Sequence, residues 1–287
     1  MTHAVELGII GGTGIYQINE VTVIDEITIE TPYGDTSSPI IIGEIGGKPI
    51  AFLARHGFGH VIPPSEINYR ANIYALKKLG IKSIISISAC GSLREDFAPG
   101  DIVIPDQIID FTKDRKRTFF EKGLVAHIST ADPFCTHLSK LLYDATVDTG
   151  ASVHNGGALV TIEGPRFSTK AESNLFRSWG MSIIGMTTSP EVFLAREAEI
   201  CYAAFAHVTD YDVWHISEES VNVDMILKVL KKNAELANQA IVNVVDLFKS
   251  YECECHHSLN FALTSSPEYI DPTQREKLSI LVDKYLK

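Results

Sequence analysis

The chain has 287 residues, of which 45% are hydrophobic and 21% are charged, a composition typical of a folded globular protein rather than a disordered one. Its formal net charge of −11 argues against a nucleic acid or an anionic membrane as the main partner. No apolar run approaches the roughly 20 residues of a membrane-spanning helix, the first six residues do not resemble a signal peptide, and five cysteines fit reduced thiols better than a secreted disulfide framework. We therefore expect a cytoplasmic protein, in which an anionic small substrate would need a local cluster of positive charges.

Short β-branched runs alternate with helical patterns along the chain, which predicts an α/β fold: a single domain with a central mixed β-sheet flanked by helices. The predicted strands cover residues 5–10, 21–29, 40–45, 50–54, 83–88, 101–104, 159–162, 183–186 and 202–208. One helix is expected after Ser65, as its N-cap, and should end at Gly80. The longest helical pattern covers 223–248, and another covers 275–286.

The best boundary lies at 251–258, which divides a main domain, residues 1–250, from a C-terminal extension, residues 251–287. The segment 111–126 contains a charged run and two phenylalanines. We interpret it as a solvated surface loop in preference to a substrate lid.

The first glycine-rich stretch, GIIGGTGIY, follows the first predicted strand. It does not complete a dinucleotide-binding fingerprint, because Gln17 occupies the place of the third glycine. Its bare backbone N–H groups and the hydroxyl of Thr13 could instead surround an anion.

Polar and small residues follow several other predicted strands, where ligands of α/β sheets collect. Arg55 supplies a fixed positive charge and His56 a titratable donor, while Ser88 and Ala89 offer a hydroxyl and an accessible amide, and Thr187 a further hydroxyl. Each has a structural alternative: an ion pair for Arg55, a core position for His56, a turn cap for Thr187. Their shared position at strand ends favours a site for a tetrahedral oxyanion such as phosphate.

Two further strand ends have a different character. The segment after residue 162 carries Phe167 and Ser168, and an aromatic face could stack on a planar ring. Asp210 and Asp212 follow the last predicted strand and point to one side if the chain stays extended. Such a pair can differ in pKa, so that one carboxyl donates a proton while the other accepts a hydrogen bond. An Asx turn or a helix N-cap is the structural alternative for either residue.

The motifs GGTG, RHG, SACGSLRE, PGDIVI, TIEGPRFSTKAES, GMTTSPE and TDYDVW occur in this order between residue 8 and about residue 250. This combination resembles the purine-type nucleoside phosphorylases, and within them most of all the branch that cleaves 5′-methylthioadenosine. The resemblance implies the fold of that family and phosphorolysis, in which phosphate attacks the anomeric carbon of a nucleoside and the purine leaves.

By the same resemblance, site roles transfer to matching positions. Phosphate would be bound by Thr13, Arg55, His56, Ser88, Ala89 and Thr187; the base by Phe167, Ser168, Asp210 and Asp212; the ribose and methylthio group by Met186, His127, Val223, Ile226 and Leu227. Asp210 and His56 are the candidate catalytic residues, with Asp210 protonating purine N7. The alternative for Val223, Ile226 and Leu227 is that they form the core-facing side of a helix.

The resemblance also implies inorganic phosphate as co-substrate and neither a metal nor an organic cofactor. His127 matches a residue that the family supplies from a neighbouring subunit, so a homotrimer or a dimer of trimers is expected.

Base preference depends on the two aspartates. A carboxylate accepts a hydrogen bond from the amino group of adenine but repels the carbonyl of a 6-oxopurine, and in 6-oxopurine relatives the resemblance leads us to expect Asn in place of Asp210. We therefore favour adenine. Two alternatives stay open: a phosphorylase of inosine-type or methylthioinosine nucleosides, and a non-catalytic adenine-nucleoside binding protein.

The tail departs from the animal enzymes at CECHH, residues 253–257. Its four potential ligands, Cys253, Cys255, His256 and His257, allow a zinc site or a redox pair of cysteines. We favour a structural tail or subunit contact, because the four ligands crowd into five residues.

Overall fold

The computed structural model describes residues 5–12, 20–215 and 223–286. Its strands are β1 (Leu7–Gly11), β2 (Thr22–Ile27), β3 (Ile40–Ile45), β4 (Lys48–Ala54), β5 (Ser83–Ser92), β6 (Ile102–Ile104), β7 (Gln107–Phe111), β8 (Val153–Asn155), β9 (Ala158–Ile162), β10 (Ile183–Gly185) and β11 (Cys201–Asp210). Its α-helices are α1 (Tyr69–Leu79), α2 (Thr136–Val147), α3 (Lys170–Ser178), α4 (Thr188–Glu197), α5 (Val223–Leu247), α6 (Pro272–Lys277) and α7 (Ser279–Val282), with 3-10 turns η2 (Glu254–His257) and η3 (Pro267–Tyr269).

The strands form one mixed sheet that branches at β5. Its main path runs β2-β3-β4-β1-β5-β10-β9-β7, while β11 pairs with β5 and β6, and β6 pairs with β8. Strands β4, β1, β5 and β11 are parallel neighbours in that part of the sheet. This confirms the predicted α/β class with a central mixed sheet.

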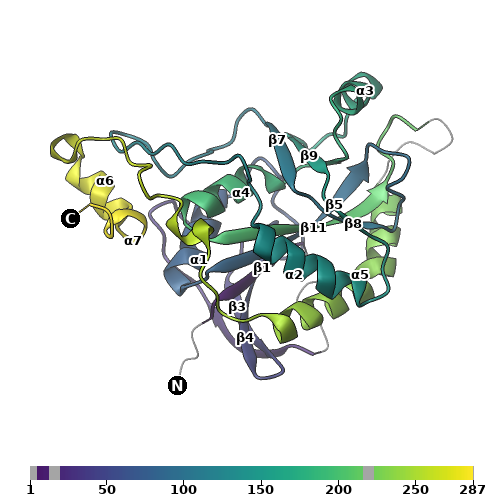
Figure 1. The fold of residues 1–287 in the computed structure, drawn as a ribbon, viewed down its shortest axis with the longest axis horizontal. Coiled ribbons are helices and arrows are strands. Elements are labelled where there is room, and N and C mark those ends of the chain that lie inside the picture. Colours follow the sequence, from purple (N-terminus) through teal and green to yellow (C-terminus); the bar gives the residue numbers. More distant parts are fainter. Residues whose placement is uncertain (1–4, 13–19, 216–222, 287) are drawn as a thin grey trace.

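Helices cover both faces of the sheet (Figure 1). Apolar residues of α1 and α4, such as Ile73 and Val192, pack in one buried cluster. Those of α2 and α5, such as Leu138 and Ile241, pack in a second cluster. Strand β11 lies between these layers and is buried along its whole length, which explains why its sequence reads as a continuous apolar run.

All nine predicted strands are present, with boundaries that move by a few residues, whereas β7 and β8 were not predicted. The long helix is confirmed as α5. Helix α1 starts later than expected: its N-cap is Asn68, whose side chain accepts from the Ala71 amide, while the Ser65 hydroxyl donates to Glu163. Gly80 ends the helix at φ +98°, a backbone conformation that favours glycine.

The interpretation of 111–126 as a solvated loop is wrong. Arg115, Phe119, Phe120 and Leu124 are all buried, and the phenylalanines and Leu124 belong to the same core cluster as α1 and α4. Within the charged run, Arg115 faces inward, because its guanidinium donates hydrogen bonds to the Met186 and Ser189 carbonyls.

The C-terminal segment places Leu259, Leu278, Leu281 and Val282 in the core cluster of α1 and α4. Helices α6 and α7 lie at one end of the molecule (Figure 1). The division at residue 250 stays a prediction. Among the described residues, no helix has both the length and the apolar character needed to cross a membrane.

Candidate active site

The carboxyl ends of four parallel strands meet at one edge of the sheet. Gly11 of β1 pairs with Ala54 of β4, and the Arg55 amide donates to the Gly11 carbonyl at 2.9 Å. On the other side of β5, Gly91 pairs with Asp210 of β11. The register therefore brings the predicted strand-end residues to a common edge.

Arg55 lies beneath this edge and is 1% exposed. Its Nε and Nη2 donate to the two carboxylate oxygens of Glu191 at 2.8 and 2.7 Å, and Nη2 also donates to Ser86 Oγ at 2.6 Å. Burial alone would lower the pKa of Arg55, but the Glu191 carboxylate raises it above the ordinary value. Among the described residues, Nη1 donates only to the Ile87 carbonyl, so its second N–H is the one available to an anion.

His56 is buried and neutral. Its Nδ1 donates to the Ile62 carbonyl at 2.8 Å, since a carbonyl can only accept, and its ring stacks on His60. Burial is the main cause that lowers the pKa of His56 to about 4. From the sequence, His56 was expected to be a titratable donor. In the structure it is a neutral ring whose Nε2 can accept a hydrogen bond, which suits the O–H of monohydrogen phosphate.

The remaining phosphate candidates are partly placed by the structure. Ser88 and Ala89 lie half-buried in β5. Thr187 is buried and stands at the N-cap of α4, but its hydroxyl makes no capping bond, so the alternative of a side-chain cap is not supported. Thr13 lies outside the described residues.

Asp210 and Asp212 are both buried at the end of β11, at 7% and 6% exposure. Asp210 accepts from the Thr209 hydroxyl at 2.7 Å and from the Asp212 amide at 2.8 Å, which is the Asx arrangement considered from the sequence. Burial raises the pKa of both carboxyls, that of Asp212 to about 6. Asp212 takes a left-handed backbone conformation, φ +51°, which re-aims its side chain after the strand ends.

Gly91 makes room for this pair. A Cβ on Gly91 would lie 2.9 Å from Oδ1 of Asp210 and 3.3 Å from Cβ of Asp212. The same Cβ would lie 3.1 Å from Cγ2 of Ile184. The 2.9 Å contact is closer than real Cβ atoms come, so a side chain at 91 would press on the Asp210 carboxyl and crowd Asp212 and Ile184.

Ser168 Oγ is buried and has no hydrogen-bond partner among the described residues. Ser173 is a neighbour of Asp212 and acts to lower the pKa of that carboxyl, against the effect of burial. Buried polar groups are normally satisfied, and a polar ligand such as a purine edge would satisfy the Ser168 hydroxyl. Phe167, next to Ser168, is half-buried.

Met186 contacts both Arg115 and Gly164. Its carbonyl accepts from Arg115 Nη1 at 2.7 Å, and a Cβ on Gly164 would come within 2.7 Å of its sulfur. Arg115 also donates to the Ser189 and Glu163 carbonyls, each at 2.7 Å. The buried guanidinium therefore joins the ends of β9 and β10 at the predicted ribose side.

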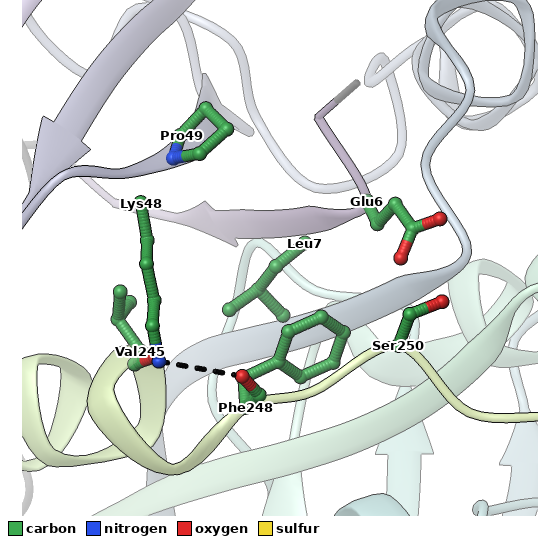
Figure 2. A pocket seen from close by; sticks show the side chains of 7 residues that line it. All are labelled: Glu6, Leu7, Lys48, Pro49, Val245, Phe248 and Ser250. Carbon is green, nitrogen blue, oxygen red and sulfur yellow. Dashed lines mark hydrogen bonds between the residues drawn. The ribbon is translucent and has the colours of Figure 1, made fainter. Parts of the chain in front are cut away.

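Two hollows lie at different edges of the sheet. One adjoins the Met186 side and is lined by Phe111, Lys113, Ile162, Glu163, Gly164, Arg166 and Glu172. Figure 2 shows the other, lined by Glu6, Leu7, Lys48, Pro49, Val245, Phe248 and Ser250. There Lys48 Nζ donates to the carbonyls of Val245 and Asp246 at 2.8 and 2.6 Å, which stabilises the end of α5. Lys48 begins β4 and Arg55 follows its end, so this second hollow lies at the opposite edge from the predicted site.

The model of the phosphorylase superfamily matches residues 6–246. This chain belongs to that superfamily. An S-methyl-5′-thioadenosine phosphorylase of Chloroflexus aurantiacus is 48% identical over 285 residues, which is 99% of each chain. A crystal structure of a methylthioadenosine phosphorylase from an antarctic soil metagenomic library covers 97% of this chain and 99% of its own, with 46% identity and a TM-score of 0.93. The Schistosoma mansoni methylthioadenosine phosphorylase, solved in complex with adenine, is 35% identical, with coverage of 97% and 98% and a TM-score of 0.82. Within the superfamily, the chain is a member of the methylthioadenosine phosphorylase family.

Four candidates of this phosphorylase fold are not brought into the strand-end site by described contacts. His127 is exposed, and its amide donates to the Ala262 carbonyl at 2.9 Å. Val223, Ile226 and Leu227 lie on α5, but their side chains fall outside the described part of the chain.

Three residues of the candidate site could not be assigned their place from the sequence. Glu191 lies within the quoted GMTTSPE motif, yet only the fold shows that it pairs with Arg55. Gly91 was singled out because small residues leave backbone amides accessible, and not because it leaves space for Asp210 and Asp212. Arg115 was predicted to be solvated with its charged neighbours, because the five consecutive charged residues 113–117 gave no sign that one side chain turns inward.

Proposed function

We propose that this protein catalyses phosphorolysis of 5′-methylthioadenosine to adenine and 5-methylthioribose 1-phosphate. The observation that carries the proposal is the buried Asp210–Asp212 pair beside Gly91, at the same sheet edge as Arg55 and His56. The family membership supports it, because the relatives are named for this reaction.

In the proposed reaction, a phosphate oxygen forms a bond to the anomeric carbon while the bond from that carbon to purine N9 breaks. The electron pair of the broken bond goes to the purine. Asp210 delivers a proton to N7, which neutralises the developing negative charge and lowers the barrier. The phosphate also stabilises the positive charge on the sugar.

Phosphate would be held by the Nη1 N–H of Arg55, by Nε2 of His56 as an acceptor, by the hydroxyls of Thr13, Ser88 and Thr187, and by the Ala89 backbone. Because Glu191 already neutralises Arg55, the guanidinium acts as an oriented donor more than as a free positive charge. Directional hydrogen bonds to charged oxygens are the stronger kind.

The base would stack on Phe167 and meet Ser168, with Asp212 accepting from the amino group of adenine. An ionised Asp212 would repel the carbonyl of a 6-oxopurine. That the Schistosoma mansoni relative was solved with adenine supports this assignment. Met186, Val223, Ile226 and Leu227 would line the ribose and methylthio group.

The reaction needs no metal or organic cofactor, because phosphate is the nucleophile and the protein's own groups supply the proton and the charge stabilisation. We further propose that the enzyme is cytoplasmic and works as a homotrimer or dimer of trimers in which His127 reaches a neighbouring site. Active monomers in sedimentation experiments would contradict this assembly.

The function is tested by chromatography of base release from 5′-methylthioadenosine, with and without phosphate, beside methylthioinosine and inosine. We expect adenine, and only with phosphate. Preferential release of 6-oxopurines would overturn the base assignment. No release from any nucleoside, with binding of methylthioadenosine intact, would favour the binding-protein alternative.

A further inference from the structure

Four cysteines from three separate segments meet on the side of the sheet away from the strand-end site. They are Cys135, Cys201, Cys253 and Cys255, and their sulfur atoms all lie within 4.8 Å of one another. Three of them are at most 5% exposed, and all are free thiols. We call this group the cysteine quartet.

The quartet joins parts of the chain that are far apart in sequence. Cys135 is the N-cap of α2, Cys201 is the first residue of β11, and Cys253 and Cys255 belong to the tail around η2. Backbone hydrogen bonds fix the first two, since the Cys135 amide donates to the Tyr202 carbonyl and the Cys201 amide to the Lys82 carbonyl. Two of the four thiols therefore start from backbone positions fixed by the sheet and by the start of α2.

Their spacing suits one four-coordinate ion. Zinc binds thiolates at about 2.3 Å in a tetrahedron, which places the sulfurs about 3.8 Å apart. Cys135 Sγ and Cys253 Sγ are 3.7 Å apart, far longer than the roughly 2 Å of a disulfide.

Hydrogen-bond donors surround the sulfurs. Arg196 Nη1 donates to Cys255 Sγ at 3.1 Å, His256 Nε2 lies 3.5 Å from Cys201 Sγ, and the Tyr251 hydroxyl lies 3.8 Å from Cys135 Sγ. Four thiolates around a divalent ion carry a net charge of −2, so donors and a guanidinium at the sulfurs are the neighbours that such a site requires.

We propose that the cysteine quartet binds one zinc ion, which fastens the C-terminal tail to α2 and β11. The site takes only two of its ligands from the CECHH run. His256 becomes a neighbour of the ligands, and His257, half-exposed, lies beside Glu252 at 3.8 Å. The sequence-based argument against a zinc site in the tail considered Cys253, Cys255, His256 and His257 alone, without Cys135 and Cys201.

The proposed ion is structural. Cys201 and Asp210 are the two ends of β11, which places them about 30 Å apart at the usual rise of a strand. A site with four protein ligands also leaves no position for a substrate. What the ion would stabilise is the tail, which delivers Leu259 and Leu281 to the core.

The test is metal analysis of the full-length protein, purified under reducing conditions without chelator or added metal. We expect one molar equivalent of zinc, released by a mercurial reagent into a colorimetric dye. The double variant Cys253→Ser, Cys255→Ser should lose it. The matched control is Cys90→Ala, a buried cysteine outside the quartet, which should keep it.

A second measurement keeps the test decisive if the double variant fails to fold. The wild-type protein, stripped of metal and reduced, is titrated with Co²⁺, and a tetrathiolate site should give the intense visible bands of tetrahedral cobalt at one equivalent. Binding of neither Zn²⁺ nor Co²⁺ by the reduced protein would overturn the proposal. So would disulfides among the four cysteines of the untreated protein, counted as missing thiols after denaturation. Because the readout is metal content, this result is independent of whether the proposed phosphorolysis holds.

Discussion

Glu191 and Arg55 form an ion pair with two hydrogen bonds in which both side chains are essentially inaccessible to solvent, at 0% and 1% exposure. Replacing Glu191 by Gln keeps the shape but leaves a buried guanidinium without its counter-charge. Breaking a buried pair in this way costs about 3–5 kcal/mol of the free energy of unfolding.

We expect the Glu191→Gln loss to be smaller in phosphate, because the anion replaces the missing negative charge next to Arg55. Thermal unfolding at increasing phosphate concentration measures both effects. The control is Asp144→Asn, which removes an exposed pair with Lys140 and should change stability by less than about 1 kcal/mol. A Glu191→Gln variant with wild-type stability at zero phosphate would contradict the argument.

Gly91→Ala should damage nucleoside cleavage. The added methyl would press on Asp210 and Asp212 from 2.9 and 3.3 Å, and a displacement of about 1 Å in a positioned group costs roughly 100-fold in rate. We expect kcat/KM for methylthioadenosine to fall by about that factor, measured by adenine release.

Gly185→Ala is the matched control for that substitution. The nearest atom to its Cβ would be the Ala89 carbonyl oxygen at 3.9 Å, an ordinary contact. If kcat/KM fell equally in the Gly91→Ala and Gly185→Ala variants, the proposed role of Gly91 in leaving space for the two carboxyls would be wrong.

Asp210→Asn should lower the rate on methylthioadenosine by about 10²–10⁴-fold, because an amide cannot act as the acid at N7. The same change should shift the preference toward 6-oxopurine nucleosides, since an amide can donate as well as accept. The ratio of kcat/KM values for methylthioadenosine and methylthioinosine is the measurement. An unchanged ratio would refute our interpretation of Asp210.

The raised pKa of Asp212 predicts that the rate of nucleoside cleavage depends on pH. Burial and the nearby Asp210 raise the pKa of Asp212 from 3.8 to about 6. Its proposed role requires a carboxylate, so kcat/KM for methylthioadenosine should rise as pH increases through about 6 and should fall below it. Asp212→Asn should lack this limb, which initial rates between pH 5 and 8 would show.

The same raised pKa affects stability with the opposite sign. The folded protein holds this proton more tightly than the unfolded chain, so the ionised Asp212 destabilises the fold, and its cost grows between about pH 4 and pH 6 and persists above. Protonation of Asp212 by itself therefore does not destabilise the fold below pH 6. If the free energy of unfolding of wild type relative to Asp212→Asn did not fall with pH over this interval, the raised pKa would be wrong.

Much of the fold could be predicted because its signals are local. The long strands are apolar runs, several of them rich in β-branched residues, and the parallel arrangement of β1, β4 and β5 places their carboxyl ends together. That is why Arg55 and His56 could be predicted at one edge with Ser88 and Ala89. Strands β7 and β8 escaped prediction because both are only partly buried, and β8 is the three-residue stretch Val-His-Asn, with a single apolar residue.

The sequence by itself determined the class of fold, the set of strand-end residues and, through the order of its motifs, the family. It could not show which of these groups face each other. The Arg55–Glu191 pair spans 136 positions of sequence, and the inward turn of Arg115 depends on the Glu163 and Met186 carbonyls, which follow β9 and β10.

The cysteine quartet shows the same limit most clearly. Cys135 and Cys253 are 118 positions apart, and nothing local to either residue indicates the other. Contacts of this kind are decided by strand register and helix packing over the whole chain. Only the tertiary structure supplies those, because many sequences share the same local patterns while the buried pairings between distant segments are specific to one arrangement.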